Sequence, residues 1–437
     1  MSTTAMSRTD AFPHATTLES LRFTTLLALP NVAGGLFSRR PTVAAVLDRA
    51  GVAGRAHRLL TALHRRYGDG PIWVNVGRTP TLIVLGPEQI RFALEHAPDP
   101  FASDPEPKRS GMTKFQPHAL TISRGAQWSD RRHFTETVLS NATGPGAIAG
   151  RCEEVAREEA RSMPDRLTWH QFHSAIQRLA RRIILGDSAS ADTRVSDQLV
   201  TLMRAANPPG NGDARLLKDF LATLERYVAA AEADSLVGCF AAAPTSDITF
   251  PTHQVTHWMF AMGDTLAINL WRCLALLGTD PRILATAQNR ITAGSGRDYL
   301  AGCLSEAMRL WPTTPLLART LTRATAWDGE MVPEGTQVMV VNSFNHRDIA
   351  CVPYANRFDP EAWTDGDAHT SWSFNFFSRG PQGCPGADLA LRLGTAILTE
   401  LLSGRSPTAP GTMLDPERPL PLTLDHTRID IRFLARR

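Results

Sequence analysis

A single cysteine follows a loop rich in glycine and proline and precedes a run of apolar residues with helical spacing. The stretch runs from Phe374 to Glu400, and its cysteine is Cys384. Pro385 is typical of a first helical turn, because its missing N–H would have no partner there, and Gly404 marks the expected helix end. The dipole at a helix N-terminus favours a thiolate over a thiol, and the glycines of the loop let a flat partner approach the sulfur. The stretch therefore predicts an anionic sulfur ligand that faces a planar group.

The residues around this cysteine carry a resemblance. Phe377, Gly380, Cys384 and Gly386 fall on the pattern F-x-x-G-x-x-x-C-x-G, and the chain is similar in this respect to the cytochrome P450 superfamily. The resemblance implies that Cys384 is the axial ligand of the iron of haem b. It also implies the cytochrome P450 fold, which is mainly α with a smaller β-rich lobe. A buried structural cysteine beside a glycine turn is the alternative that the loop alone leaves open.

Cationic residues elsewhere in the chain could hold the carboxylates of such a cofactor. Trp128 and Arg132 are four residues apart, so that they share one face of a helix, and an indole N–H with a guanidinium can bind a carboxylate. The resemblance implies that both residues contact a haem propionate, as does Arg319, with Arg323 as the neighbour that could be confused with it. An ordinary amphipathic helix with a half-buried tryptophan is the alternative.

The run from Thr252 to Leu277 is apolar on almost every side of a helix, which indicates a helix through the core. Asp264 and Thr265 stand in its middle, where a carboxylate is costly without a partner or a function. The resemblance implies that the two side chains deliver protons to bound dioxygen, although Met262 replaces the usual glycine. The alternative is an aspartate in a salt bridge and a threonine that bonds back to the helix carbonyls.

Glu306 and Arg309 are three residues apart on one predicted helix face. As an isolated pair they would be a surface salt bridge of little value, whereas the resemblance implies a structural lock behind the haem. Two residues depart from the family pattern. Ala362 stands where an arginine often completes this lock, with Arg357 as a candidate substitute, and Gln382 stands where an arginine or histidine usually meets a propionate. Both departures predict weaker anchoring of the cofactor.

Shorter patterns in the sequence predict the remaining helices and strands. We expect a helix over 55–67, strands over 71–77 and 81–85, a helix over 87–96, a strand over 337–341 and a strand pair over 421–433. Residues 1–45 are rich in Ser and Thr and predict a loosely ordered N-terminal arm. Residues 46–437 are expected to form a single cytochrome P450 domain.

The net charge, the cysteine content and the hydrophobic pattern of the chain argue against several classes of protein. The chain has 437 residues with a net charge of +3, which is too small to predict nucleic-acid binding. Its six cysteines are scattered singly, which predicts neither a zinc site nor a disulfide framework and fits a reducing cytoplasm. The N-terminal apolar stretch is too broken to predict a membrane span. Lysine is rare beside arginine, a bias associated with a GC-rich bacterial genome.

The resemblance implies a haem-thiolate monooxygenase that inserts one oxygen atom of O2 into a lipophilic small molecule, with secondary metabolism as one setting. The substrate cavity is expected to be bordered by Phe260, Ala261, Leu316 and Leu317. We expect a monomer that receives electrons from a separate ferredoxin or flavodoxin. A peroxygenase, isomerase or dehydratase that needs no electron donor remains an alternative, as does a non-catalytic haem- or ligand-binding protein.

Overall fold

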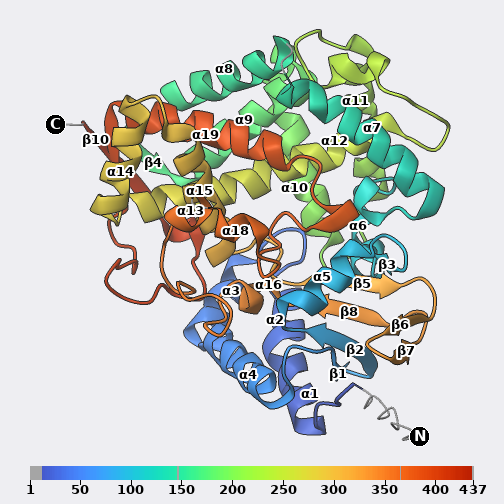
Figure 1. Cartoon of the computed structure of the whole chain (residues 1–437). Coiled ribbons are helices and arrows are strands. Elements are labelled where there is room, and N and C mark those ends of the chain that lie inside the picture. The colour runs from blue at the N-terminus through green and yellow to red at the C-terminus, as the bar shows by residue number, and fades with distance from the viewer. Residues whose placement is uncertain (1–11, 145–146, 365, 436–437) are drawn as a thin grey trace, which may run out of the picture.

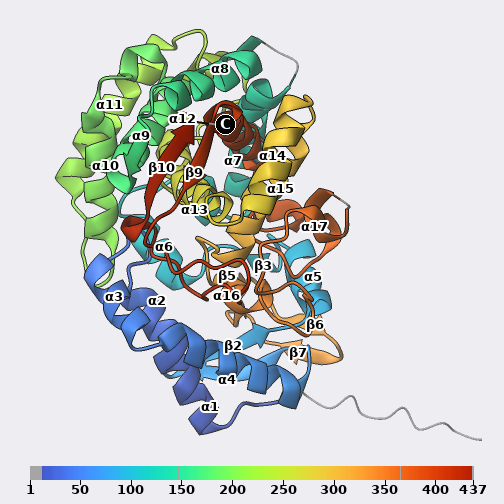
Figure 2. The same ribbon diagram turned by 90° about the vertical axis from the view of Figure 1, so that its left-hand side faces the viewer.

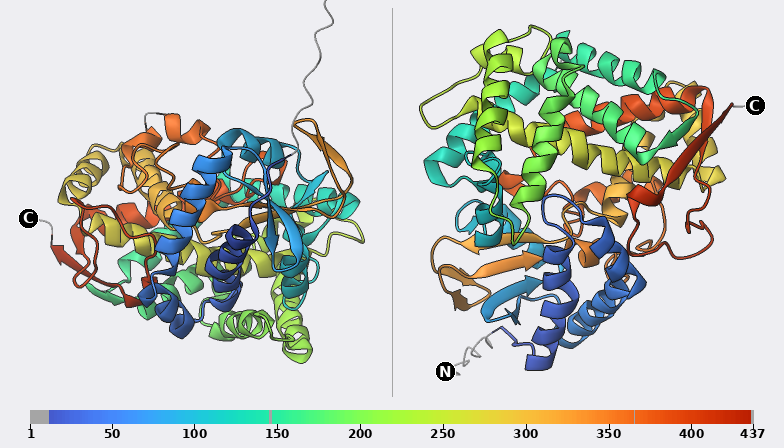
Figure 3. Two further views of the ribbon diagram at one scale, coloured as in Figure 1. Left: turned by 90° about the horizontal axis from the view of Figure 1, so that it is seen from below. Right: turned by 180° about the vertical axis from the view of Figure 1, so that it is seen from behind.

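The protein is described from a computed structural model, which covers residues 12–144, 147–364 and 366–435. A large helical part carries a smaller β-rich part at one side (Figure 1), as the sequence predicts. The first and last elements, α1 and β10, lie at opposite ends of the molecule (Figure 3).

Helices account for most of the described chain. The α-helices are α1 Thr17–Phe23, α2 Leu29–Ala33, α3 Pro41–Arg49, α4 Val52–Tyr67, α5 Pro87–Glu95, α6 Glu106–Met112, α7 Gly125–Thr143, α8 Ala147–Arg161, α9 Trp169–Leu185, α10 Thr193–Ala206, α11 Ala214–Ala230, α12 Pro251–Phe260, α13 Ala267–Leu277, α14 Pro281–Thr292, α15 Gly296–Leu310, α16 Asn342–Asn345, α17 Glu361–Thr364, α18 Asp367–Thr370 and α19 Ala387–Ser403. The π-helices are η1 Thr24–Ala28 and η5 Ala261–Leu266, and the 3-10 helices are η2 Leu120–Ile122, η3 Asp187–Ala189, η4 Val237–Ala242, η6 Gly380–Gln382 and η7 His426–Arg428.

The strands form three sheets. They are β1 Ile72–Val76, β2 Thr79–Val84, β3 Phe101–Ala102, β4 Arg166–Thr168, β5 Leu317–Leu321, β6 Thr325–Trp327, β7 Glu330–Val332, β8 Gln337–Val340, β9 Arg405–Thr408 and β10 Asp430–Ala435. The largest sheet has the order β1-β2-β8-β5-β3, and only the β2–β8 pair in it is parallel. The order β4-β10-β9 forms a second sheet beside the helical part, and β6 and β7 form a hairpin. The larger sheet brings β5, with Arg319, to the inside of the molecule.

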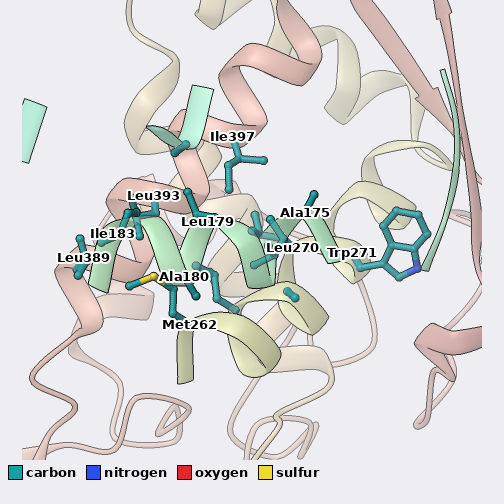
Figure 4. Packing of buried hydrophobic residues seen from close by; sticks show 14 of the residues in the cluster. Ala175, Leu179, Ala180, Ile183, Met262, Leu270, Trp271, Leu389, Leu393 and Ile397 are labelled. Atoms are coloured by element: carbon teal, nitrogen blue, oxygen red, sulfur yellow. The ribbon is translucent and has the colours of Figure 1, made fainter. Parts of the chain in front are cut away.

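The core lies where α9, α19 and the α12–η5–α13 segment pack together. Leu389, Leu393 and Ile397 recur at every fourth position of α19, so that they lie on one face of the helix. Figure 4 shows this face together with apolar side chains of α9 and with Met262 and Leu270. This packing fixes the start of α19, and with it the cysteine loop, relative to η5.

The N-terminal prediction is wrong for the part of the chain that the structure describes. From Thr17 onward this segment forms α1, η1, α2 and α3 instead of a loose arm, while residues 1–11 lie outside the described residues. Phe23 and Leu27 are buried against α4 and the sheet, and Figure 2 shows α1 and α4 below β2, with α2 and α3 to its left. The apolar residues, three to four positions apart, supply a core-facing stripe that a Ser/Thr-rich composition concealed.

Two further boundaries differ from the sequence prediction. Helix α19 begins at Ala387, with Gly386 as its N-cap, so Pro385 belongs to the loop and not to the first turn. Of the strand pair expected over 421–433, the structure forms only β10, which pairs with β9 and β4. The other short strands and helices lie at the positions that we expected, within a few residues.

The segment Pro251–Leu277 is the one described helix whose length and apolar composition would allow it to cross a membrane. In its most apolar window 72% of the residues are buried inside the molecule. Figure 1 shows the segment running through the helical part, as the sequence predicts for a core helix.

Candidate functional site

A cavity of about 310 Å³ lies between η5 and the loop that precedes α19. It gathers most of the site residues that the sequence singles out. These are Trp128, Arg132, Phe260, Ala261, Thr265, Leu317, Arg319, Phe377, Gln382, Cys384 and Gly386. Residues separated by more than 250 positions thus meet around one space, which the isolated motifs could not establish.

The cysteine loop is held by its own backbone. The Cys384 N–H donates to the Phe377 carbonyl oxygen at 2.7 Å, and Arg132 donates from Nη1 to the Gly383 carbonyl oxygen at 2.5 Å. Gly380 has a φ of +65°, and a Cβ added there would lie 2.2 Å from the Leu94 carbonyl oxygen, so only glycine fits. These contacts turn the exposed surface of Cys384 toward the cavity.

The residues around Cys384 act on its thiol in opposite directions. Burial raises the pKa of the Cys384 thiol, and the Gly386 N–H and the Arg132 charge lower it by less. A metal cation at the sulfur would reverse this balance, since a coordinated thiol is deprotonated.

Two cations meet the cavity without any anion beside them. Arg319 is 1% exposed and donates only to the neutral oxygens of Ala318 and Ser378, while its Nε has no partner. Burial lowers the pKa of Arg319 to about 10, and burial together with the Arg319 charge lowers the pKa of Lys108 to about 7. No carboxylate in the described residues forms an ion pair with either side chain. A buried guanidinium without an anion beside it is costly, and the half-buried Lys108 likewise has none, so this edge of the cavity suits an anionic ligand.

Other polar groups at the cavity also have unused hydrogen-bonding capacity. Both polar atoms of the Gln382 side chain are buried without a partner. The structure describes no acceptor for the Trp128 indole N–H, although this residue lines the cavity beside Arg132. Ser378, which accepts from Arg319 at 3.0 Å, adopts a φ of +56°, a conformation that non-glycine residues rarely take outside functional sites.

The acid and the alcohol of η5 point in different directions. Thr265 lines the cavity, and its hydroxyl forms no hydrogen bond with any residue that the structure describes. The Asp264 carboxylate instead lies 2.5 Å from Nε2 of His173 on α9 and does not line the cavity. The alternative of a salt-bridged aspartate is thus realised, whereas that of a threonine bonded back to the helix is not. Both residues lie in the π-helical turn η5, a feature frequent at functional sites.

Glu306 and Arg309 form a fully buried pair, at 2.5 Å between Oε1 and Nε. Arg309 also donates to the carbonyl oxygens of His346, Ala355 and Arg357. Arg357 therefore takes part through its backbone and not, as we considered, through its side chain. The pair contributes to the structure behind the cysteine loop and does not reach the cavity.

Two residues are placed away from the cavity. Leu316 packs with Leu60 and Phe344 around a different pocket, although its neighbour Leu317 lines the cavity, so the prediction for Leu316 is wrong. Leu316 directly precedes β5, and adjacent residues of an extended chain point to opposite sides. Arg323 forms an exposed ion pair with Asp99, so of the two neighbours Arg319 and Arg323 only Arg319 lines the cavity.

Three functional candidates had no sequence signal strong enough to find them. Lys108 donates to the Ser103 and Thr121 carbonyl oxygens at the cavity edge. His257 lines the cavity, and burial, with a smaller contribution from Lys108, lowers its pKa to about 4, so its imidazole is neutral. His173 reaches Asp264 from a region without a motif. Only the rarity of lysine in the chain could have drawn attention to Lys108.

The site is thus a cysteine sulfur that faces a cavity with unpaired cations at its edge. Residues 36–182 and 250–421 match the family model described as Cytochrome P450. This match covers well over half of the chain, so the protein belongs to the cytochrome P450 family.

Curated relatives match over a shorter part. The chain is 26% identical over 165 residues to cytochrome P450 4c3 of Drosophila melanogaster, covering 34% of this chain and 31% of that protein. It is 31% identical over 159 residues to cytochrome P450 81F1 of Arabidopsis thaliana, covering 33% and 32%. The matched part spans about a third of the length of these relatives.

Solved structures resemble the chain over most of its length. A retinoic acid-bound cyanobacterial CYP120A1 has a TM-score of 0.69 at 20% identity, covering 86% of this chain and 93% of that one. The cytochrome P450 CYP102L1 has a TM-score of 0.69 at 18% identity, covering 87% and 94%. At these identities the likeness shows the fold alone.

Proteins of this family bind haem through a cysteine thiolate, and the cavity fits this cofactor. The cations Lys108 and Arg319 lack the anions that two propionates would supply, and the free Trp128 N–H adds a donor. Cys384 is the residue that would bind the iron.

Proposed function

We propose that the protein is a haem-thiolate monooxygenase that inserts one oxygen atom of O2 into a lipophilic small molecule. The observation that carries this proposal is the shared cavity. Cys384 and Thr265 line the same space, with unpaired cations at its edge and mainly apolar side chains elsewhere.

Each residue has a role that its position supports. Cys384 binds the iron, and Arg319 and Lys108, with Trp128 and Arg132, hold the propionates through charge-assisted hydrogen bonds. Bound haem supplies the oxidation, and a thiolate ligand favours cleavage of the O–O bond. The protein's own contribution is to position the substrate, exclude water and deliver protons.

The Thr265 hydroxyl is placed to hold a proton or a water in the cavity, because nothing else in the described chain uses it. Asn269, one turn further along, donates to the Thr265 carbonyl oxygen and leaves its own Oδ1 buried without a partner. The two side chains together form a polar point in an apolar wall. Proton delivery at this point supports oxygen activation over a reaction that needs no protons.

The substrate is a lipophilic molecule that lies against Phe260, Ala261 and Leu317. His257 adds one neutral polar group to this wall. Its Nδ1 lies 3.1 Å from Gln116 Oε1. We propose further that the protein works as a cytoplasmic monomer in a bacterium, in secondary metabolism, and that a separate ferredoxin or flavodoxin supplies electrons. The deep burial of the apolar helix Pro251–Leu277 supports a water-soluble form.

The test is the absorption spectrum of the purified protein, reduced and exposed to carbon monoxide. A strongly red-shifted Soret band is expected, and Cys384→Ala should abolish it. Cys351→Ala is the matched control, because this cysteine is also exposed but does not line the cavity. An imidazole-type band, or no haem, would overturn the proposal. Product formed from peroxide alone, unaffected by Asp264→Asn, would favour a peroxygenase.

A further inference from the structure

The acid of η5 is bonded to a histidine on the side of the helix away from the cavity. His173 Nε2 lies 2.5 Å from the Asp264 Oδ1 atom. The structure describes no other hydrogen bond to this carboxylate. Thr265, the next residue, faces the cavity. The η5 turn thus links a base outside the cavity to an alcohol inside it.

The histidine is fixed in place by α9. The Trp169 ring stacks on the His173 ring at 4.9 Å between centroids and 15° between planes. Helix α9 also packs directly on Gly263, where Gln177 and Ala180 approach within 4.0 Å of the position of an added Cβ. The His173–Asp264 contact is therefore part of a close helix–helix interface and not a chance meeting of surface side chains.

Both partners keep contact with water. The His173 side chain is 20% exposed and that of Asp264 18% exposed, and neither lines the cavity. This exposed surface therefore lies outside the catalytic cavity. A proton can reach the imidazole from bulk water without crossing the apolar cavity.

Other charged and titratable groups lie near the pair, but none of them is bonded to it in the described chain. His426 of η7 packs edge-on against Trp169, but burial lowers the pKa of His426 to about 2, so it is neutral. Arg272 and Arg39 act on His426 from further away. None of these residues forms a hydrogen bond with His173 or Asp264 within the described chain.

We propose that His173 delivers protons to the Asp264–Thr265 pair, so that protons enter the catalytic cavity from the α9 side. The inference rests on the proposed oxygenase function and names a residue that serves it. His173 acts through Asp264 and does not itself touch the substrate.

The proposed transfer moves protons only, and no group is oxidised or reduced. A protonated His173 loses the hydrogen on Nε2, and Asp264 gains it as a carboxylic acid. The Asp264 side chain then turns from His173 toward the cavity and gives this proton to the Thr265 hydroxyl, which passes its own hydrogen into the cavity, or to a water held there. Asp264 returns as a carboxylate to His173. The neutral imidazole regains its proton from hydronium in bulk water.

The test compares turnover driven by electrons with turnover driven by peroxide. His173→Gln keeps a hydrogen-bond donor for Asp264 but cannot pass a proton on. We expect electron-driven product formation to fall about tenfold or more, with the reducing equivalents recovered as hydrogen peroxide. Turnover with added peroxide should change little, because peroxide brings its own protons. His170→Gln is the matched control, an exposed histidine on the same helix.

A structural role would give a different result. If His173→Gln lowers both modes of turnover equally, or neither, the proposal is wrong. NMR of a sample with labelled histidine adds a readout that needs no turnover. The His173 Nε2 resonance should shift in Asp264→Asn, and an unchanged resonance would also overturn the proposal. If the wild type shows no thiolate-type carbon monoxide band, the proposed function fails, while the resonance still reports on the His173–Asp264 coupling.

Discussion

The indole nitrogen of Trp363 donates a hydrogen bond of 2.8 Å to Oε1 of Glu306, beside the position where Ala362 replaces a common arginine. The Asp359 N–H donates to Oε2 of the same carboxylate at 2.9 Å. Glu306 thus receives two neutral donors in addition to Arg309, of which the Trp363 indole is buried and the Asp359 amide half-buried. The lock is completed by an indole and a backbone amide instead of a second guanidinium.

Removal of the carboxylate should destabilise the fold strongly. Glu306→Ala would leave the Arg309 charge buried without its partner, which costs about 3–5 kcal/mol, whereas Trp363→Phe removes one hydrogen bond to a charged group, about 1.5–3 kcal/mol. Urea unfolding followed by far-UV circular dichroism measures both. The control is Arg323→Ala, which breaks an exposed ion pair and should cost less than about 1 kcal/mol. Equal losses in all three variants would contradict this view of the network.

The cations Arg319 and Lys108 should govern retention of the cofactor. Arg319→Met and Lys108→Met remove the charges that face the propionates while keeping a long side chain in place. We expect each variant to lose haem about tenfold faster or more, because a charge-assisted hydrogen bond contributes about 1.5–3 kcal/mol. Transfer of haem to excess apomyoglobin gives the rate. Arg323→Met, between β5 and β6 and outside the cavity, should leave the rate unchanged, and a faster loss there would point to a general loosening of the sheet.

A substitution at Gln382 should improve retention of the cofactor. Its amide is buried at the cavity without a partner, and a family member usually has a cationic residue here. Gln382→His is expected to slow the loss of haem relative to the wild type, because an imidazole can donate a stronger hydrogen bond to a carboxylate when protonated. The same transfer assay tests this. A faster loss would show that the amide itself contacts the cofactor better than an imidazole does.

Local signals in the sequence predicted much of this architecture. The core helix around Asp264 and the loop at Cys384 each depend on residues a few positions apart, so spacing indicated them. For Glu306 and Arg309 spacing indicated only the pairing, and the resemblance implied its structural role. The prediction of a loose N-terminal arm failed because the stripe around Phe23 is short and becomes visible only when α4 and the sheet pack on it.

The direction of side chains could not be predicted in the same way. Leu316 and Leu317 are neighbours in the sequence, yet only the register of β5 decides which one reaches the cavity. Lys108 and His173 stand in segments without a motif, and they reach the site only through tertiary contacts. Charge balance inside a cavity is likewise a property of the assembled fold.

The pairing of His64 should make stability depend on pH. His64 lies 2.6 Å from Asp348 and 2.5 Å from Asp69, and the Asp348 contact is the largest cause that raises the pKa of His64 to about 9. Because the folded state binds the proton more tightly than the unfolded one, this stabilisation is fully present below pH 6.5 and is lost as the pH rises toward 9. The difference in free energy of unfolding between wild type and His64→Gln, from urea titrations, should therefore shrink across that window. His170→Gln should show no such trend, and a difference that grows with pH would mean that His64 is neutral in the folded protein.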